Sequence, residues 1–206
     1  MSPLLLTAIF VLIGAVVLEV VIPRIGEVKI ERRLTDRGGD AYVALEAFPA
    51  ILLLQHRGER IEVKGRNIAV GTSKGGGGLT VLDGFRHVEI GLQRFTTGPF
   101  EVEEFALSRH GGGNYLMRSE ARTTSSALAD FSVEPLGQVG AGLIGLVARG
   151  SQLGDVSFTV SVEVELESEG GLLRIVDGDG TIGGYPAGPI ATLIAAAVAR
   201  RLEIVY

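Results

Sequence analysis

An uninterrupted apolar run from Leu4 to Ile22 constrains this chain more than any other segment. It contains 19 residues and a single charged one, Glu19, near its end. As a helix rising about 1.5 Å per residue, it is roughly 28 Å long, close to the roughly 30 Å hydrocarbon core of a bilayer. Secretory signal peptides have shorter apolar regions of about 7–15 residues. The run therefore predicts a signal-anchor or transmembrane helix over residues 1–22, in preference to a cleaved signal peptide, with a buried core helix as the third alternative.

The charges around the run bear on its orientation in a membrane. Only the α-amino group precedes it, whereas Arg24, Lys29, Arg32 and Arg33 follow it. Taken alone, the positive-inside rule keeps the residues that follow the run on the cytoplasmic side. Export of the following domain is instead favoured by the family resemblance described below.

The apolar run continues into a segment with a helical pattern. Ile25 and Val28 recur at helical spacing among charged residues, and Pro23 suits a first helical turn or a kink. Gly38 and Gly39 are typical of a helix end. We therefore expect the membrane segment to run directly into the first helix of a single domain, residues 23–206, and to hold that domain at the bilayer surface.

Composition limits what this domain can be. The chain has 206 residues, a formal net charge of -5 and no cysteine. The lack of cysteine excludes disulfides, thiolate metal sites and a cysteine nucleophile, and the acidic balance provides no basic field for nucleic acid. About 180 residues outside the apolar run are enough for one domain with a hydrophobic core.

Alternating apolar and polar residues recur along most of the domain. With glycine-rich turns at about ten-residue spacing, such segments are typical of an antiparallel meander. Phase shifts at Gly65 and across Glu103 and Glu104 predict bulges, and hence a sheet that bends strongly. Strands are expected over residues 41–48, 59–70, 87–93, 100–107, 115–122 and 155–167, with a hairpin partner over 172–182.

Helical patterns occur at residues 124–131 and from Pro189 onward, and residues 51–54 predict either a buried helical turn or an apolar lip. The expected fold class is α+β: a long, curved antiparallel sheet with an N-terminal and a C-terminal helix packed on it.

Four short motifs resemble those of a known family. They are residues 47–54 (AFPAILLL) followed by Gly58, Asp83-Gly-Phe85 with Val88, Gly98-Pro-Phe100, and residues 188–193 (GPIATL). Together they resemble the LmeA-like family of phospholipid-binding envelope proteins of high-GC Gram-positive bacteria. The resemblance implies a tubular lipid-binding-like domain, associated with the plasma membrane on its extracytoplasmic side. It carries over no catalytic residue.

A lipid-binding domain needs apolar side chains around the acyl chains. Burial of each CH₂ group contributes about 0.8 kcal/mol, and the interaction is not directional. Each candidate is equally well explained as ordinary core. The candidates for lining such a groove are Phe48, Leu53, Phe85, Phe95, Phe100, Leu143 and Ile144.

Two patterns resemble cofactor sites but lack the context that these sites need. Residues 140–145 match G-x-G-x-x-G, yet Pro135 disfavours a preceding strand and no βαβ unit surrounds them. Asp177 to Gly180 begins like a calcium loop but lacks the terminal glutamate, so a turn is expected there. We therefore expect no cofactor.

The three histidines give no metal signature. His56, His87 and His110 are far apart in the sequence and lack metal-binding spacing, so we expect them at the surface and expect no metal site. The leading expectation is a non-enzymatic protein with a single-pass N-terminal anchor that binds a phospholipid or related lipid and presents or transfers it in cell-envelope biogenesis. The alternative is an envelope scaffold with a solid core that binds a protein partner, and an enzyme ranks third.

Overall fold

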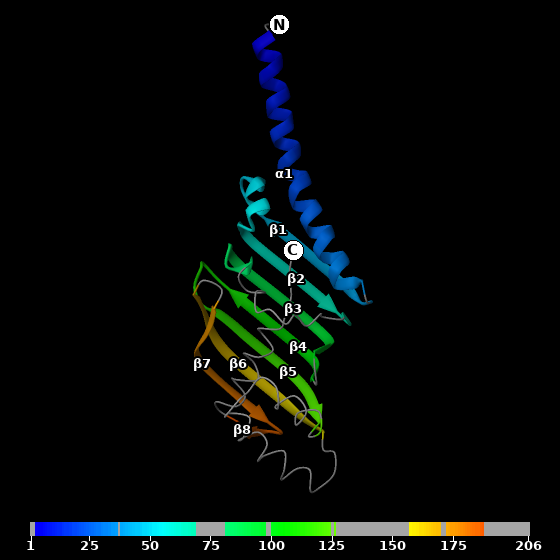
Figure 1. The fold of residues 1–206 in the computed structure, drawn as a ribbon, viewed down its shortest axis with the longest axis vertical. Helices are drawn as coiled ribbons and strands as arrows, with labels where there is room; N and C mark the ends of the chain where they lie inside the picture. Colours follow the sequence, from blue (N-terminus) through cyan, green and yellow to red (C-terminus); the bar gives the residue numbers. More distant parts are fainter. Residues whose placement is uncertain are drawn as a thin grey trace.

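The computed structural model describes residues 3–36, 38–68, 81–97, 100–124, 126, 157–169 and 172–187. In the first helix, side chains are described at Leu12 and from residue 16 onward. Within these residues the chain is an α+β protein, in which a long N-terminal helix lies against one edge of an eight-stranded sheet (Figure 1).

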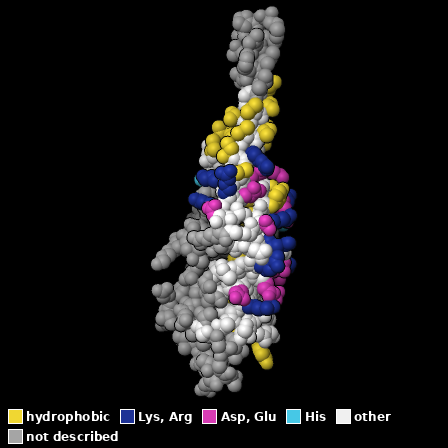
Figure 2. All heavy atoms as spheres, turned by 90° about the vertical axis from the view of Figure 1, so that its right-hand side faces the viewer, with side chains coloured by type: hydrophobic (Ala, Val, Ile, Leu, Met, Phe, Trp, Pro, Cys, Tyr) yellow, Lys and Arg dark blue, Asp and Glu magenta, His cyan; other side chains and the backbone are white. Residues whose placement is uncertain are grey.

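The N-terminal helix, α1 (Pro3–Thr35), is one continuous element of 33 residues. The expected continuity between the apolar run and the amphipathic segment is thus confirmed, with Pro23 inside the helix. The helix ends where Gly38, at a φ of 105°, donates its N–H to the carbonyl of Thr35 at 2.8 Å. Its N-terminal half projects beyond the sheet, and exposed hydrophobic side chains gather on the part nearest the domain (Figures 1 and 2).

The sheet is open, and its strands follow one another in chain order from one edge to the other. The expected strands are present, and the hairpin partner over 172–182 is confirmed. A short 3₁₀ helix, η1 (Ala50–Gln55), separates the first two strands. The strands are β1 (Asp40–Glu46), β2 (Gly58–Arg66), β3 (Phe85–Thr97), β4 (Phe100–Arg109), β5 (Tyr115–Thr124), β6 (Ser157–Glu169), β7 (Leu172–Ile182) and β8 (Tyr185–Pro186).

The expectation of a purely antiparallel sheet is wrong at one pair. β2 and β3 run parallel, with Ile61 opposite Val88 and Val63 opposite Ile90. A parallel pair needs a crossover of a dozen or more residues, and residues 67–84 are long enough to provide it. All other neighbouring strands are antiparallel.

One of the two predicted bulges is present. The pairing of β4 with β5 shifts between Val102 and Glu104, as the phase change there predicts. The bulge predicted at Gly65 is wrong, because Gly65 pairs in regular register with both neighbouring strands. The phase changes just after the strand instead, where Asn67 adopts a φ of 54° and the next residue, Ile68, is buried.

The turn predicted at Asp177 to Gly180 is also wrong, because these residues continue β7. Asp177 and Asp179 stand opposite Glu165 and Glu163 of β6. Their carboxylates accept hydrogen bonds from the N–H groups that directly follow them in the chain, at 2.8 and 2.7 Å. The pairing with β6 thus overrides the local preference of Asp-Gly for a turn.

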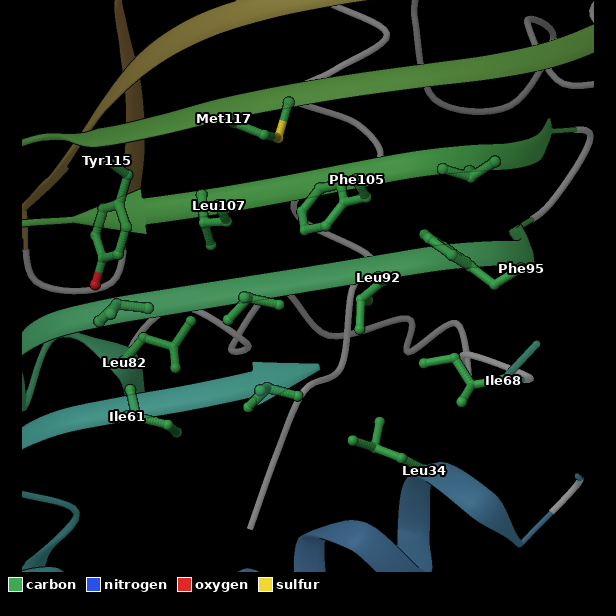
Figure 3. Close-up of a cluster of buried hydrophobic side chains, with 14 of the residues drawn as sticks. Leu34, Ile61, Ile68, Leu82, Leu92, Phe95, Phe105, Leu107, Tyr115 and Met117 are labelled. Carbon is green, nitrogen blue, oxygen red and sulfur yellow. The ribbon is translucent and has the colours of Figure 1, made fainter. Parts of the chain in front are cut away.

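One face of the sheet carries the hydrophobic core. The alternation along each strand places aliphatic and aromatic side chains on this face, where they form one cluster that also includes Leu34 of α1 (Figure 3). The ring of Phe95 meets that of Phe105 edge to face, with centroids 6.3 Å apart. Such a pair stabilises by about 0.5–1.5 kcal/mol beyond the burial of its area.

Helix α1 covers the free edge of β1 through its acidic side chains. Glu27 accepts a hydrogen bond from the backbone N–H of Leu45 at 3.2 Å, and Glu31 accepts one from the N–H of Val43 at 3.1 Å. Ile30 and Leu34 of the same helix are buried. The N-terminal helix expected to pack on the sheet is therefore confirmed.

Two other helical predictions lie outside the described residues: most of the helix over 124–131, and the C-terminal helix that begins at Pro189. In the part of the chain that is described, no helix has the combination of length and apolar character needed to cross a membrane. The membrane helix over residues 1–22 stays a prediction.

Candidate functional site

The large hydrophobic side chains described between Leu12 and Val21 of α1 point into solvent instead of packing on the domain. Their exposed fractions range from 41% at Val21 to 67% at Val20. At 3.6 residues per turn, Val16 and Leu18 lie on nearly opposite sides of the helix, so the apolar character is not confined to one stripe. We refer to this part of α1, residues 12–21, as the exposed apolar segment. Its large side chains are Leu12, Val16, Val17, Leu18, Val20 and Val21.

A second exposed apolar group comes from η1 and the residues before it. Phe48 is 86% exposed, Leu54 67% and Ile51 54%, whereas Ala50 and Leu53 of the same turn are buried. The sequence predicted either a buried helical turn or an apolar lip here. The structure has both: one side of the turn is buried and the other side is an exposed apolar lip. We call Phe48, Ile51 and Leu54 the apolar tip.

Glu19 joins these two apolar groups. Its carboxylate accepts a hydrogen bond from the backbone N–H of Ala50, the first residue of η1, at 2.8 Å. The first N–H groups of a helix have no partner within it, and a carboxylate is a favourable acceptor for them. The single charge in the apolar run thus has a structural role that its position in the sequence did not indicate.

Basic side chains follow the two apolar groups along the chain. Arg57 is exposed just after η1, and exposed Arg24 forms an ion pair with Glu27 at 3.2 Å. Figure 2 shows Lys and Arg side chains beside the lower end of the hydrophobic zone. Further along α1, a hollow of about 600 Å³ is lined by Arg24, Ile25, Val28, Lys29, Arg32, Arg33 and Asp36.

A partly buried polar cluster closes the end of the sheet near η1. The carboxylate of Asp83 accepts hydrogen bonds from Tyr115 at 2.9 Å, Ser168 at 2.5 Å and Arg109 at 3.3 Å. Arg109 also donates to the Tyr115 hydroxyl at 2.9 Å, while its buried Nε has no partner. Burial raises the pKa of Tyr115 well above its usual value, and the Asp83 carboxylate adds to this rise.

This cluster is suited to holding structure together and is poorly suited to proton transfer. Tyr115 stays protonated at any physiological pH, and the hydroxyl of Ser168 is bound to a carboxylate instead of a histidine. The cluster ties the turn before β3 to the ends of β4, β5 and β6. Its members are separated by up to 85 residues in the chain, so no local pattern predicted it.

The outer face of the sheet is charged and carries two shallow depressions. They have volumes of about 420 and 430 Å³ and share Glu104 and Ala106 at their boundary. Gly91 and Ala106 form a low floor in the first, because small side chains stand opposite each other on β3 and β4. Lys64 and Tyr42 stand beside this floor.

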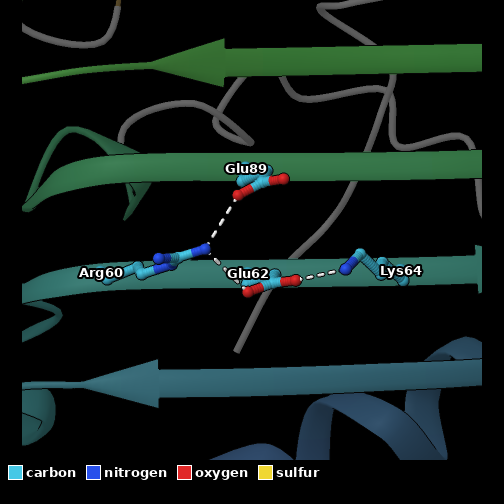
Figure 4. A network of polar contacts seen from close by, with 4 residues as sticks. All are labelled: Arg60, Glu62, Lys64 and Glu89. Carbon is cyan, nitrogen blue, oxygen red and sulfur yellow. Dashed lines mark hydrogen bonds and ion pairs between the residues drawn. The ribbon is translucent and has the colours of Figure 1, made fainter.

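Ion pairs organise the charges on this face. Glu62 contacts Lys64 at 2.6 Å and Arg60 at 3.0 Å, and Arg60 reaches Glu89 on the next strand at 2.9 Å (Figure 4). The hydrogen bond from Lys64 is the main reason why the pKa of Glu62 is lowered. In the described part of the chain, no group of three or more metal-ligating side chains converges.

The structure separates the sequence-predicted lipid-binding residues. Leu53, Phe85, Phe95 and Phe100 belong to the one buried core cluster or pack within it, each at most 5% exposed. Phe48 instead faces solvent in the apolar tip. Leu143 and Ile144 lie outside the described residues.

The histidines are closer together than their sequence separation suggests. All three lie at the end of the sheet where β2 and β3 begin and β4 ends. The rings of His87 and His110 stand edge to face with centroids 6.1 Å apart. The antiparallel pairing of β3 with β4 brings these two residues together, since it joins the start of one strand to the end of the other.

Comparisons of this chain with known protein families, curated proteins and solved structures find no match. The resemblance to the LmeA-like family therefore stays a prediction. The function is argued below from the geometry of the described residues.

Proposed function

We propose that this protein is a membrane-anchored, non-enzymatic lipid-binding protein whose domain sits on the extracytoplasmic surface of a plasma membrane. One observation carries the proposal: the large hydrophobic side chains of the exposed apolar segment of α1 spread around most of the helix and face solvent. A surface helix of a soluble domain has an apolar stripe, whereas a helix that is apolar all round is surrounded by protein or by lipid. Lipid is the surrounding that we propose for this part of α1.

Magnitudes support insertion into a bilayer. Full burial of a valine or leucine side chain is worth about 1.5–3 kcal/mol. The exposed apolar segment contains six such side chains that are at least 41% exposed, so their transfer into hydrocarbon contributes several kcal/mol. The apolar residues that precede the segment in the sequence add to this contribution.

The cargo that we propose is a phospholipid or a related lipid. The apolar face of the sheet, which includes Phe85, Phe95 and Phe100, is the surface on which acyl chains would lie in a curved, tubular domain. Presentation or transfer of this lipid in envelope biogenesis is the proposed role, and the side of the membrane follows from the family resemblance.

The alternative is a scaffold domain that binds a protein partner. It is favoured by the close packing of the same aromatic side chains, which are 1–3% exposed and belong to one continuous cluster. A filled core leaves no room for acyl chains, so the two functions differ in whether lipid accompanies the protein.

Two measurements on the full chain, purified from bacterial membranes in mild detergent, separate these functions. Native mass spectrometry is expected to show bound lipid, which extraction then identifies. Repeated recovery of lipid-free protein that takes up no added phospholipid would favour the scaffold.

Flotation with phospholipid vesicles tests the anchor independently. The double variant Leu12→Lys with Val16→Lys is expected to lose flotation, because charges deep in hydrocarbon are costly. The matched control places the same charges on β7 and β8, as Val176→Lys with Tyr185→Lys, at exposed positions far along the sheet. Equal flotation of both variants would overturn the membrane anchor.

A further inference from the structure

The apolar tip is an ordered structure that presents large hydrophobic side chains to solvent. We propose that Phe48, Ile51 and Leu54 form a second membrane contact, which enters the headgroup region of the same bilayer that receives α1. This inference rests on the proposed membrane anchor and adds that the domain is held at two points instead of hanging from one helix.

The position of the tip follows from the bond between Glu19 and Ala50. This 2.8 Å contact places η1 level with residue 19 of α1, beside the lower end of the exposed apolar segment. Since a helix rises about 1.5 Å per residue, Leu12 lies about 10 Å further out along the axis. Figure 1 shows η1 beside α1, at the end of the sheet from which the helix projects. When the apolar part of α1 is immersed in hydrocarbon, η1 is therefore at the depth of the bilayer surface.

The tip is held rigidly, so its insertion costs little ordering entropy. The N–H groups of His56 and Arg57 donate to the carbonyls of Leu53 and Leu52, both at 3.0 Å, and close the turn. His56 ends it in a left-handed conformation with a φ of 56°. Buried Leu53 fixes the inner side of the turn, so that the three tip side chains face outward. A preformed contact binds better than one that must first be ordered.

The charges next to the tip indicate which surface it fits. Arg57 follows η1 directly, and Arg24, which also pairs with Glu27, lies one to two helical turns beyond Glu19; both are exposed. Apolar side chains at the depth of the headgroups with basic side chains just behind them suit a bilayer that contains anionic phospholipid. Basic residues near such a surface add electrostatic attraction to it. The occupant that we propose is therefore an anionic phospholipid bilayer.

The absence of tryptophan from the chain allows a direct test. The full-length Phe48→Trp variant carries one tryptophan at the tip, and Tyr185→Trp carries one at another highly exposed aromatic position, in β8. Both are reconstituted with vesicles of phosphatidylcholine and phosphatidylglycerol, with and without brominated acyl chains. The emission of F48W is expected to shift to shorter wavelength and to be quenched by the brominated lipid, while the emission of Y185W stays unchanged.

Each other outcome has a distinct meaning. Flotation of both variants without quenching of F48W overturns the second contact and leaves the anchor intact. Failure of both to float overturns the anchor itself. If the F48W emission shifts with protein concentration and not with added vesicles, the tip contacts a second copy of the chain instead of the bilayer. This result overturns the inference.

Two further variants guard against a local artefact. Leu54→Trp places the tryptophan near the end of η1, also in the apolar tip, and is expected to be quenched as strongly as F48W. Arg57→Gln is expected to reduce the quenching of F48W on anionic vesicles and to leave it unchanged on pure phosphatidylcholine. Equal quenching on both kinds of vesicle would overturn the anionic preference.

Discussion

The carboxylate of Glu31 in α1 accepts a hydrogen bond from the backbone N–H of Val43 in β1, at 3.1 Å. Glu27 makes the same contact with Leu45 at 3.2 Å. Four residues of helix advance about 6 Å, and two residues of strand advance about 6.8 Å, so the two spacings nearly match. The side chains of a helix thereby take the place of a ninth strand, which protects an edge that otherwise invites pairing with another chain.

Removal of both acceptors is expected to loosen this edge. The double variant Glu27→Ala with Glu31→Ala leaves two partly buried N–H groups without partners, at a cost of about 1–3 kcal/mol for each. Amide hydrogen exchange at Val43 and Leu45 is expected to accelerate, and chemical denaturation is expected to show the loss of stability. The corresponding double glutamine variant keeps one side-chain acceptor oxygen at each position and should lose less stability. Equal losses of stability in the two double variants would contradict the role of these oxygens as acceptors.

Alanine is expected to destabilise the protein at Gly84 but not at Gly91. A Cβ atom on Gly84 would collide with the carbonyl oxygen of His56, and the backbone of both segments must shift to accept it. Gly84→Ala is therefore expected to destabilise by about 1–3 kcal/mol or more. A Cβ on Gly91 meets nothing within 4 Å, so Gly91→Ala should be neutral or stabilise by up to about 1 kcal/mol.

The measurement for this pair is thermal unfolding of the two variants beside the parent protein. A larger loss of thermal stability in G91A than in G84A would contradict the close approach of the residue after η1 to the turn before β3.

Tyr115 is expected to ionise only at a pH well above the usual range for tyrosine. Burial and the neighbouring Asp83 carboxylate raise its pKa above the ordinary value of about 10. Because the folded state holds this proton more tightly, the stabilisation is fully present below about pH 10 and is lost as the pH rises further. An alkaline titration followed by phenolate absorbance is expected to show a late phase.

The late phase should disappear in Tyr115→Phe and persist in Tyr185→Phe, which removes an exposed tyrosine instead. The stability of Y115F should also fall less steeply above pH 10 than that of the parent. Titration of every tyrosine near pH 10 in the folded protein would contradict the buried cluster.

Glu62 is expected to titrate below its usual pKa, chiefly because of its hydrogen bond with Lys64. A lowered pKa stabilises the folded state above the ordinary value, and this stabilisation is lost as the pH falls through the folded value. NMR titration of the carboxyl carbon should show the pKa of Glu62 rising in Lys64→Met, and rising less in Arg60→Met. The reverse order would show that Arg60 dominates.

Local patterns were enough to predict most strands. The alternation from Val160 to Leu166 specifies which face of β6 is buried, and a phase change across Glu103 and Glu104 marks a real bulge. A period of two carries no information about strand direction, which is why the parallel pairing of β2 with β3 was not predicted.

Long-range polar contacts were beyond the reach of sequence patterns for a different reason. On a helix, Glu27 and Glu31 are typical of a solvated face, and only the proximity of β1 gives them partners. Asp83 and Ser168 likewise carry no local signal in the sequence, and only the folded sheet brings the Ser168 hydroxyl within 2.5 Å of the Asp83 carboxylate. The candidate aromatic residues were expected in one groove, but Phe48 lies apart from the other three because its turn faces outward.

Contacts at both ends of the stretch from Glu19 to Glu31 fix the number of residues in this part of α1. Glu19 binds η1 and Glu31 binds β1, and both contacts come from one unbroken helix. Inserting a single residue between them would turn one attachment about 100° away from its partner while the other stayed in place. Substitutions at the exposed positions of this stretch leave both contacts in register, whereas insertions and deletions break one of them.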